Sequence, residues 1–346
     1  MRVIPDQDSR DLAAMCRSLL AANLEPAAQW KALAEAGVLG LAIDKQHGGS
    51  GGSLGDLGIF SVEAGRALCP KAVHSTVHAA LAIEWLGTPE MRAAWLPGLV
   101  SGAAHGTIAL FSQRDASNVT PALRARPDGA GWLLGGVADF VGDADMADVV
   151  VVTAQADDTT LVFVVETAET TVEPVAMMGG HRAFTVRFDD VLADGGVPVS
   201  DQQLRRMANA VVALHCLDLV GVGEAAVQRT VDHTKMREQF GRPIATFQAA
   251  QHLVADMHIA LAAARLAAQS AVFWIGQGRT ATRQTAVARM RATEVKKVTL
   301  DAHQLHGGMG YVVDTDLHKY SERARVLSTF GGGADVASTW LEGADL

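Results

Sequence analysis

Three stretches with different apolar spacing follow one another along the chain, and their order leaves few folds open. Residues 1–108 carry apolar side chains every three or four positions, as amphipathic helices do. Residues 109–199 consist of short β-branched runs between polar turns, which is typical of a small antiparallel barrel or sandwich. Residues 200–346 return to helical spacing in long, alanine-rich segments. We therefore predict an α+β, mostly α fold with an N-terminal helical domain, a middle β-barrel and a C-terminal helical bundle.

The composition excludes several classes of protein. The 346 residues are 49% hydrophobic and 19% charged, so the chain can bury a large core over two or three domains. The net charge of -9 argues against a nucleic-acid partner, which would require a basic face. No apolar segment looks long enough to span a bilayer, and the start of the chain lacks the apolar core of a signal peptide. We therefore expect no membrane partner.

Cysteine usage indicates the compartment. Cys16, Cys69 and Cys216 fit neither a zinc-ligand spacing nor a disulfide framework. A reducing environment is the default for such a chain, which predicts a cytoplasmic protein.

The segment REQFGRPIATFQ, residues 237–248, is the first candidate binding motif. By itself it predicts a helix that ends at Phe240, with Gly241 as its cap. This structural interpretation is favoured on local grounds, but it gives no role to the guanidinium of Arg237 or the amide of Gln248. An arginine at a helix end can instead bind a phosphate through two hydrogen bonds.

The segment HQLHGGMGY, residues 303–311, is the second candidate. A helix end followed by a glycine turn explains it. Bare backbone at Gly307 and Gly308 approaching a planar or phosphorylated ligand explains it equally well. A diglycine alone does not decide between the two.

Taken together with three further segments, these motifs resemble the acyl-CoA dehydrogenase family over nearly the whole chain. The further segments are WKALAEAGVLGLAIDKQHGGSGGSLGD, GTPEMRAAWLPGLVSG and FTVRFDDV. The resemblance implies three domains, over residues 1–108, 109–199 and 200–346, the last a four-helix bundle. It also implies FAD-dependent oxidation of the Cα–Cβ bond of an acyl-CoA thioester. In that reaction a glutamate removes the Cα proton, and the Cβ hydrogen leaves as hydride to the flavin.

The family carries this glutamate at one of two positions, and neither is acidic here. The usual position aligns with Gly331, inside the run FGGG. Some relatives carry the glutamate on the first long C-terminal helix, where this sequence has Val211, with Val212 beside it. The resemblance thus implies a chain without a catalytic residue at either position.

The flavin contacts of the family divide into two sets. Two segments would hold the flavin ring of the chain's own FAD, and both depart from the family pattern: FSQRDASN at 111–118 and FVG at 140–142. The residues that a family member gives to the FAD of a neighbouring subunit are intact, namely Arg237, Phe240, Gly241, Gln248, Gln304, Gly307 and Gly308.

This combination resembles the non-catalytic, β-type subunit of actinobacterial α2β2 acyl-CoA dehydrogenases of steroid side-chain degradation. It implies an FAD at an interface with a glutamate-bearing partner subunit. It also implies an acyl-CoA substrate with a bulky, steroid-like acyl group, and electron-transfer flavoprotein as the acceptor.

Two other functions stay open, a flavin-dependent monooxygenase on the same fold and a structural homologue without flavin. The changes in the chain's own flavin segments count against the first, and the intact Arg237 motif counts against the second. A displaced base is also conceivable, although such residues usually lie on solvated faces or in ordinary hydrogen bonds. The candidates are Glu224, Glu238, Asp335, Glu342, His303 and His306.

Overall fold

The computed structural model describes residues 5–22, 24–129 and 131–342 of the chain. Its N-terminal part is helical, and local sequence signals open its helices. Ser53 and Asp56 form a capping box at the start of one helix, and the Thr88 hydroxyl accepts a hydrogen bond from the Met91 N–H at the start of another. The helices of this part are α1 (Gln7–Ala21), α2 (Pro26–Glu35), α3 (Leu54–Arg66), α4 (Lys71–Leu86) and α5 (Pro89–Val100).

The middle part is an eight-stranded sheet. Its strands are β1 (Gly106–Ala109), β2 (Leu123–Asp128), β3 (Gly131–Gly142), β4 (Val149–Ala156), β5 (Thr159–Glu166), β6 (Thr171–Val175), β7 (Ala183–Ala193) and β8 (Val197–Pro198). Their order is β6-β7-β3-β2-β4-β5-β8, and β1 pairs with β4. The sequence predicted antiparallel strands; β4 does pair antiparallel with β5, but its pairings with β1 and β2 are parallel, so the prediction is wrong for those two pairs. The β2–β3 hairpin lies between β1 and β4 in the chain, so β1 and β4 can run in the same direction.

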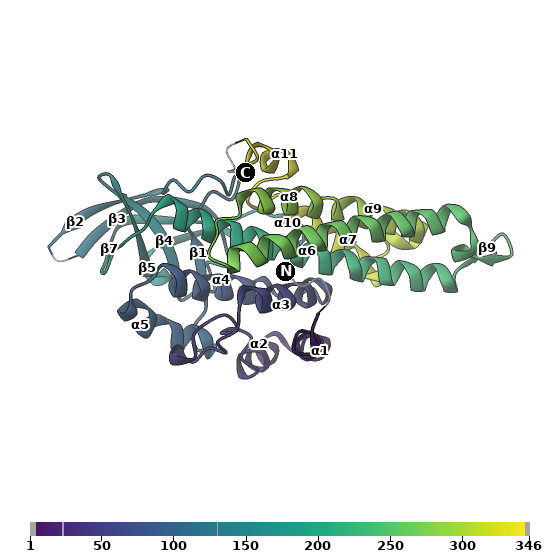
Figure 1. The fold of residues 1–346 in the computed structure, drawn as a ribbon, viewed down its shortest axis with the longest axis horizontal. Helices are drawn as coiled ribbons and strands as arrows, with labels where there is room; N and C mark the ends of the chain where they lie inside the picture. Colours follow the sequence, from purple (N-terminus) through teal and green to yellow (C-terminus); the bar gives the residue numbers. More distant parts are fainter. Residues whose placement is uncertain (1–4, 23, 130, 343–346) are drawn as a thin grey trace.

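The C-terminal part is a bundle of long helices. They are α6 (Asp201–Met236), α7 (Gln248–Gly276), α8 (Thr282–Ala292), α9 (Val295–His306), α10 (Leu317–Leu327) and the short α11 (Ala334–Thr339). A small hairpin of β9 (Glu238–Gln239) and β10 (Arg242–Pro243) joins α6 to α7. Figure 1 shows the bundle extending past the N-terminal helices, with the β9 hairpin at one end of the molecule and the sheet at the other.

Helix α6 packs directly on α3 because both carry glycine at the contact. A Cβ atom at Gly221 would lie 1.9 Å from the Val62 carbonyl oxygen, and one at Gly65 would lie 2.0 Å from the Asp218 carbonyl oxygen. One hydrophobic core therefore runs from the N-terminal helices into the bundle, whereas the sheet has a separate core.

Two helices depart from the expectation that no segment could span a membrane. By length and composition alone, α6 and α7 both could, with 18-residue windows of mean hydropathy 1.7 and 1.5. In the α6 window 89% of the residues are buried inside the protein, and in the α7 window 33% are. The high hydropathy of α6 therefore reflects its place at the centre of the bundle.

The predicted α+β, mostly α fold class is confirmed, with helical N- and C-terminal parts around a central sheet (Figure 1). Cys16, Cys69 and Cys216 are free and buried. Burial raises the pKa of each thiol, to about 11 for Cys16 and Cys216 and about 12 for Cys69.

Candidate functional site

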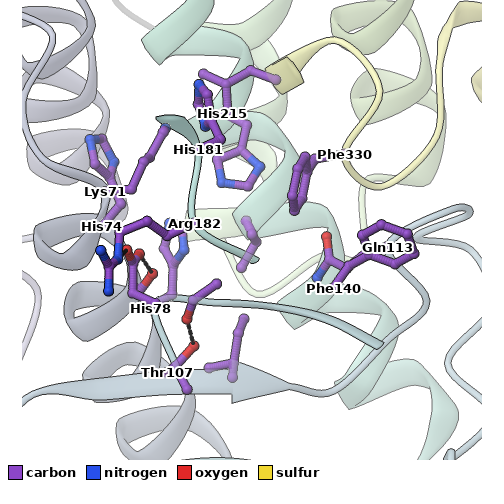
Figure 2. Close-up of a pocket in the computed structure, with 16 residues that line it drawn as sticks. Lys71, His74, His78, Thr107, Gln113, Phe140, His181, Arg182, His215 and Phe330 are labelled. Atoms are coloured by element: carbon purple, nitrogen blue, oxygen red, sulfur yellow. Dashed lines mark hydrogen bonds and ion pairs between the residues drawn. The ribbon is translucent and has the colours of Figure 1, made fainter. Parts of the chain in front are cut away.

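A small cavity lies where the N-terminal helices, the sheet and the bundle meet. We call it the central cavity. Its lining comes from α4, β1, the end of β3, α6 and the segment after α10. Figure 2 shows aromatic side chains, Phe140 and Phe330, on one side of it and a group of basic side chains, including Lys71 and four histidines, on the other.

The two positions expected for a glutamate lie side by side at this cavity. Val211, on α6, lines it and is 2% exposed. A Cβ atom at Gly331 would lie 3.2 Å from Val212 Cγ2, and the neighbouring Phe330 lines the cavity. Gly331 has φ +75°, a left-handed backbone conformation that strains any residue with a side chain. The loop conformation itself thus disfavours a glutamate at this position.

Arg289 and the chain around Gln113 hold the glycine loop in place. The Gly331 N–H donates to the Gln113 carbonyl at 2.7 Å, and the Ala116 N–H donates to the Gly331 carbonyl at 2.9 Å. The fully buried guanidinium of Arg289 donates from Nε to the Gly332 carbonyl at 2.7 Å and from Nη2 to the Phe330 carbonyl. Burial lowers the pKa of Arg289, and nearby Cys216 opposes this. Sequence reasoning missed Arg289, because an arginine in the alanine-rich helix α8 gives no sign of being buried.

The segments expected to hold this chain's own flavin form the wall between the central cavity and a second one. The second cavity shares Gln113, Phe140 and Phe330 with the first. The Arg114 guanidinium lies 5.6 Å from the centre of the Phe140 ring. Phe140 itself has a left-handed backbone conformation, with φ +57°. A flavin ring edge would meet an aromatic ring and a stacked guanidinium here, and no hydroxyl in the segment 140–142. This wall fits an isoalloxazine ring poorly.

The REQFGRPIATFQ motif forms the turn at the end of the bundle. The prediction that the helix ends at Phe240 with Gly241 as its cap is wrong. Helix α6 ends at Met236, and Phe240 and Gly241, with φ +54° and +76°, are the two turn residues of the β9–β10 hairpin. The Phe240 side chain is 94% exposed. Arg237 is exposed too and forms no ion pair within the described part of the chain.

The second motif lies beside the first. Helix α9 ends at His306, and the rings of His306 and His233, from the last turns of α6, stack with centroids 4.3 Å apart. Gln304, Gly307 and Gly308 are exposed. A Cβ atom at Gly308 would meet nothing within 4 Å, and its φ is not left-handed, so nothing inside the described chain requires glycine there. Exposed backbone with room above it suits a ligand or a second protein chain that approaches closely.

We call this surface the hairpin face, and it consists of the seven predicted cofactor-contact residues Arg237, Phe240, Gly241, Gln248, Gln304, Gly307 and Gly308. Gln248 opens α7 directly after the hairpin and is exposed. Figure 1 places the hairpin at the opposite end of the molecule from the sheet, which borders the central cavity. The hairpin face therefore cannot reach a ligand in this chain's own cavity.

The alternative bases lie outside the central cavity. Arg66 and Arg265 bind Glu224 between α3, α6 and α7. Glu238 is exposed on β9, and Glu342 is exposed near the end of the chain. His303 Nε2 lies 3.0 Å from Ser321 Oγ, and His306 Nδ1 lies 2.8 Å from the Ala302 carbonyl. Asp335 lines the second cavity, beside the glycine loop.

Sequence reasoning also missed a buried charge cluster at the central cavity. Asp218 is fully buried and accepts from Arg323 Nε at 3.0 Å, Arg323 Nη2 at 2.7 Å and Lys71 Nζ at 2.8 Å. Burial raises the pKa of Asp218, but Arg323 and Lys71 outweigh it and hold this pKa well below its usual value. Burial and Arg323 lower the pKa of Lys71 to about 8. These residues come from three helices that are distant in the sequence, so no local sequence motif predicts that they form a cluster.

Comparison with known proteins identifies the family. The family models described as acyl-CoA dehydrogenase N-terminal domain and C-terminal domain match residues 7–103 and 202–341. Acyl-CoA dehydrogenase IpdE2 of Mycobacterium tuberculosis is 30% identical over 301 residues, which cover 85% of this chain and 79% of that protein.

Two solved structures share the architecture over its whole length. The steroid acyl-CoA dehydrogenase variant Tcur3481-Tcur3483 is 30% identical, with a TM-score of 0.88 and 97% of both chains covered. The ChsE4-ChsE5 complex of Mycobacterium tuberculosis is 25% identical, with a TM-score of 0.91 and 100% of both chains covered. The predicted resemblance is thereby confirmed. The chain belongs to the acyl-CoA dehydrogenase family, whose members are oxidoreductases that act on a CH–CH bond.

Proposed function

We propose that this chain is the non-catalytic subunit of a hetero-oligomeric, FAD-dependent acyl-CoA dehydrogenase of α2β2 type. One observation carries the proposal. Both positions for the base, Gly331 and Val211, lack a carboxylate at the central cavity, while the hairpin face is intact at the opposite end of the molecule. We infer that a chain without its own base, but with an intact hairpin face, uses this face to bind a flavin held by another subunit.

The hairpin face has the chemistry for such a contact. When bound, FAD accepts a hydride from the Cβ atom of the acyl group. Arg237 offers an exposed guanidinium without a carboxylate partner among the described residues, which suits a pyrophosphate. The exposed backbone at Gly307 and Gly308 leaves room for the adenosine side of the cofactor. In this proposal a glutamate of the partner subunit removes the Cα proton, and electron-transfer flavoprotein takes up the electrons.

The similar proteins support both the assembly and the substrate class. The ChsE4-ChsE5 structure is a complex of two differently named chains, and Tcur3481-Tcur3483 is described as a steroid enzyme. We propose that the substrate here is likewise an acyl-CoA with a bulky, steroid-like acyl group, and that the enzyme works in the cytoplasm.

Charge reversal on the hairpin face tests the proposal. Arg237→Glu places a carboxylate where the pyrophosphate would lie, so we expect the complex co-expressed with a glutamate-bearing partner to lose most of its FAD and its acyl-CoA oxidation. The matched control is Arg187→Glu, on the exposed side of β7. Flavin absorbance per complex and dye reduction by acyl-CoA are the measurements.

Each alternative function predicts a different outcome. Unchanged flavin content in the Arg237→Glu complex would favour a structural homologue without a flavin role. An isolated wild-type chain that carries a full complement of FAD and oxidises acyl-CoA would show that the subunit proposal is wrong. Oxygen-dependent hydroxylation with a supplied flavin reductase would favour the monooxygenase.

A further inference from the structure

Helix α7 turns an apolar face to solvent. Its 18-residue window has a mean hydropathy of 1.5, yet only 33% of that window is buried inside the protein. Ile259 is 67% exposed and Leu266 is 43% exposed. A helix on the surface of a bundle normally carries polar and charged side chains on its outer face, and a contiguous exposed apolar face marks an interaction site. The exposed side of α7 therefore has the character of a contact surface.

The residues on this face recur at alternating intervals of three and four, the spacing by which two helices pair side by side. Bulky side chains such as Ile259 and Leu266 alternate with small or amide side chains, and none of these residues is acidic, lysine or arginine. A helix that fits this face offers bulky side chains opposite the alanines and small ones opposite Ile259 and Leu266. We call the face the α7 seam, and it consists of His252, Ala255, Ile259, Ala262, Leu266, Gln269 and Phe273.

The α7 seam is continuous with the hairpin face. Gln248 belongs to the hairpin face and is the first residue of α7, and His252 follows one helical turn later. From there the seam runs for about 30 Å to Phe273, at a rise of about 1.5 Å per residue. Figure 1 shows α7 leading from the β9 hairpin back toward the sheet. A subunit that contacts the hairpin face therefore also meets the start of the seam.

The position of the hairpin face determines how such a subunit must lie. This face and the central cavity are at opposite ends of the bundle, and α7 runs between these ends. In a partner of the same fold, the hairpin face of this chain reaches the partner's flavin only if the two bundles lie antiparallel. We propose that the α7 seam packs antiparallel against the corresponding long helix of the glutamate-bearing partner subunit. This inference rests on the proposed subunit role and adds to it the surface and the orientation of the contact.

The first test measures assembly. The double variant Ile259→Glu, Leu266→Glu places two carboxylates on the seam, and Leu192→Glu is the control, at an exposed apolar residue of β7 that is 61% exposed. Circular dichroism of each isolated chain checks that it is folded. We expect the double variant to associate with the partner at least about ten-fold more weakly, because the carboxylates would be buried unpaired. The control should assemble like the wild type, as measured by sedimentation over a range of concentrations.

The second test measures orientation. The native thiols of Cys16, Cys69 and Cys216 are buried, so a cysteine introduced by Ala255→Cys or Leu266→Cys is the accessible site for a maleimide-linked photocrosslinker. The labelled chain is mixed with the partner and irradiated, and the crosslinked peptides are identified by mass spectrometry. We expect the label at position 255 to react with the second half of the partner's helix, and the label at position 266 with its first half.

Three results would overturn the inference: the reverse order of crosslinks, crosslinks between two copies of this chain, or a double variant that assembles as tightly as the wild type. The last result, combined with loss of FAD in the Arg237→Glu complex, would leave the subunit proposal standing without the seam. A wild-type chain that assembles with no glutamate-bearing partner would contradict both. Binding of the isolated chain to phosphatidylcholine vesicles, lost in the double variant, would assign the seam to a membrane instead.

Discussion

We expect two histidines at the central cavity, His78 and His215, to contribute to the loss of stability in acid. Burial and the charge of Lys71 lower the pKa of His78 to about 3 and hold the pKa of His215 well below its ordinary value, while Asp218 opposes both shifts. The pKa of His215 is lowered further by two neighbours, His78 and Arg289. The unfolded chain takes up a proton on each ring near pH 6.5, whereas the folded chain does not. Stability is therefore lost as the pH falls below about 6.5, by up to about 1.4 kcal/mol per pH unit and ring.

We expect His215→Leu to reduce this acid loss of stability, because the substituted residue cannot take up a proton in the unfolded state. The measurement is the free energy of unfolding in urea at about pH 6.5 and about pH 5. His258→Leu, on the exposed side of α7, is the control and should leave the pH slope nearly unchanged. An identical pH slope in wild type and His215→Leu would contradict the explanation.

Arg289 holds the glycine loop, so its removal should destabilise the whole protein. Arg289→Met leaves the buried carbonyls of Phe330 and Gly332 without these donors, which we expect to cost about 2–5 kcal/mol in the free energy of unfolding. The matched control is Arg291→Met, two positions along the same helix, where the arginine is exposed and pairs with Glu294. That change should cost less than about 1 kcal/mol. Equal losses in the two variants, measured by urea unfolding, would show that the loop does not depend on Arg289.

At the level of helices, the contact between α3 and α6 depends on glycine. Gly221→Ala would place a methyl group 1.9 Å from the Val62 carbonyl, so the two helices must separate. We expect a loss of at least about 3 kcal/mol, measured as a lower midpoint of thermal or urea unfolding. Gly98→Ala, in α5, where a Cβ atom would lie at an ordinary 3.7 Å from Ala104 Cβ, should be neutral or slightly stabilising. A Gly221→Ala protein as stable as wild type would mean that the helices are not packed this closely in solution.

The elements that sequence patterns predicted well are those fixed by local periodicity. The apolar spacing of Val254, Met257, Leu261, Ala264 and Ala268 predicts one buried face of α7, and four of the five are buried, Val254 being half-buried. Two features were missed because they depend on distant contacts. The parallel pairing of β4 with β1 and β2 is set by how the chain returns to the sheet. The β9–β10 hairpin replaced a predicted helix end because Phe240 adopts a left-handed conformation that is uncommon for residues other than glycine.

For the molecule as a whole, motif spacing predicted which residues form the hairpin face, but not the distance that separates this face from the central cavity. That separation arises from the length of α6, which carries Val211 near the cavity and ends just before Arg237 at the hairpin. Local patterns also gave no sign of the histidines and Lys71, because their shared feature, a common cavity, exists only after α4, α6 and the sheet have packed together.

This separation predicts that restoring a carboxylate will not by itself create an active enzyme. Val211→Glu introduces the acid on a regular helix, without the backbone strain that Gly331→Glu would suffer at φ +75°. The wall formed by Arg114 and Phe140 would still not suit a flavin ring, so the carboxylate would have no hydride acceptor in register. We therefore expect no acyl-CoA-dependent dye reduction by the folded Val211→Glu chain supplied with FAD. Turnover by this variant alone would show that the chain's own cavity holds a flavin productively, and that only the base separates it from a complete dehydrogenase.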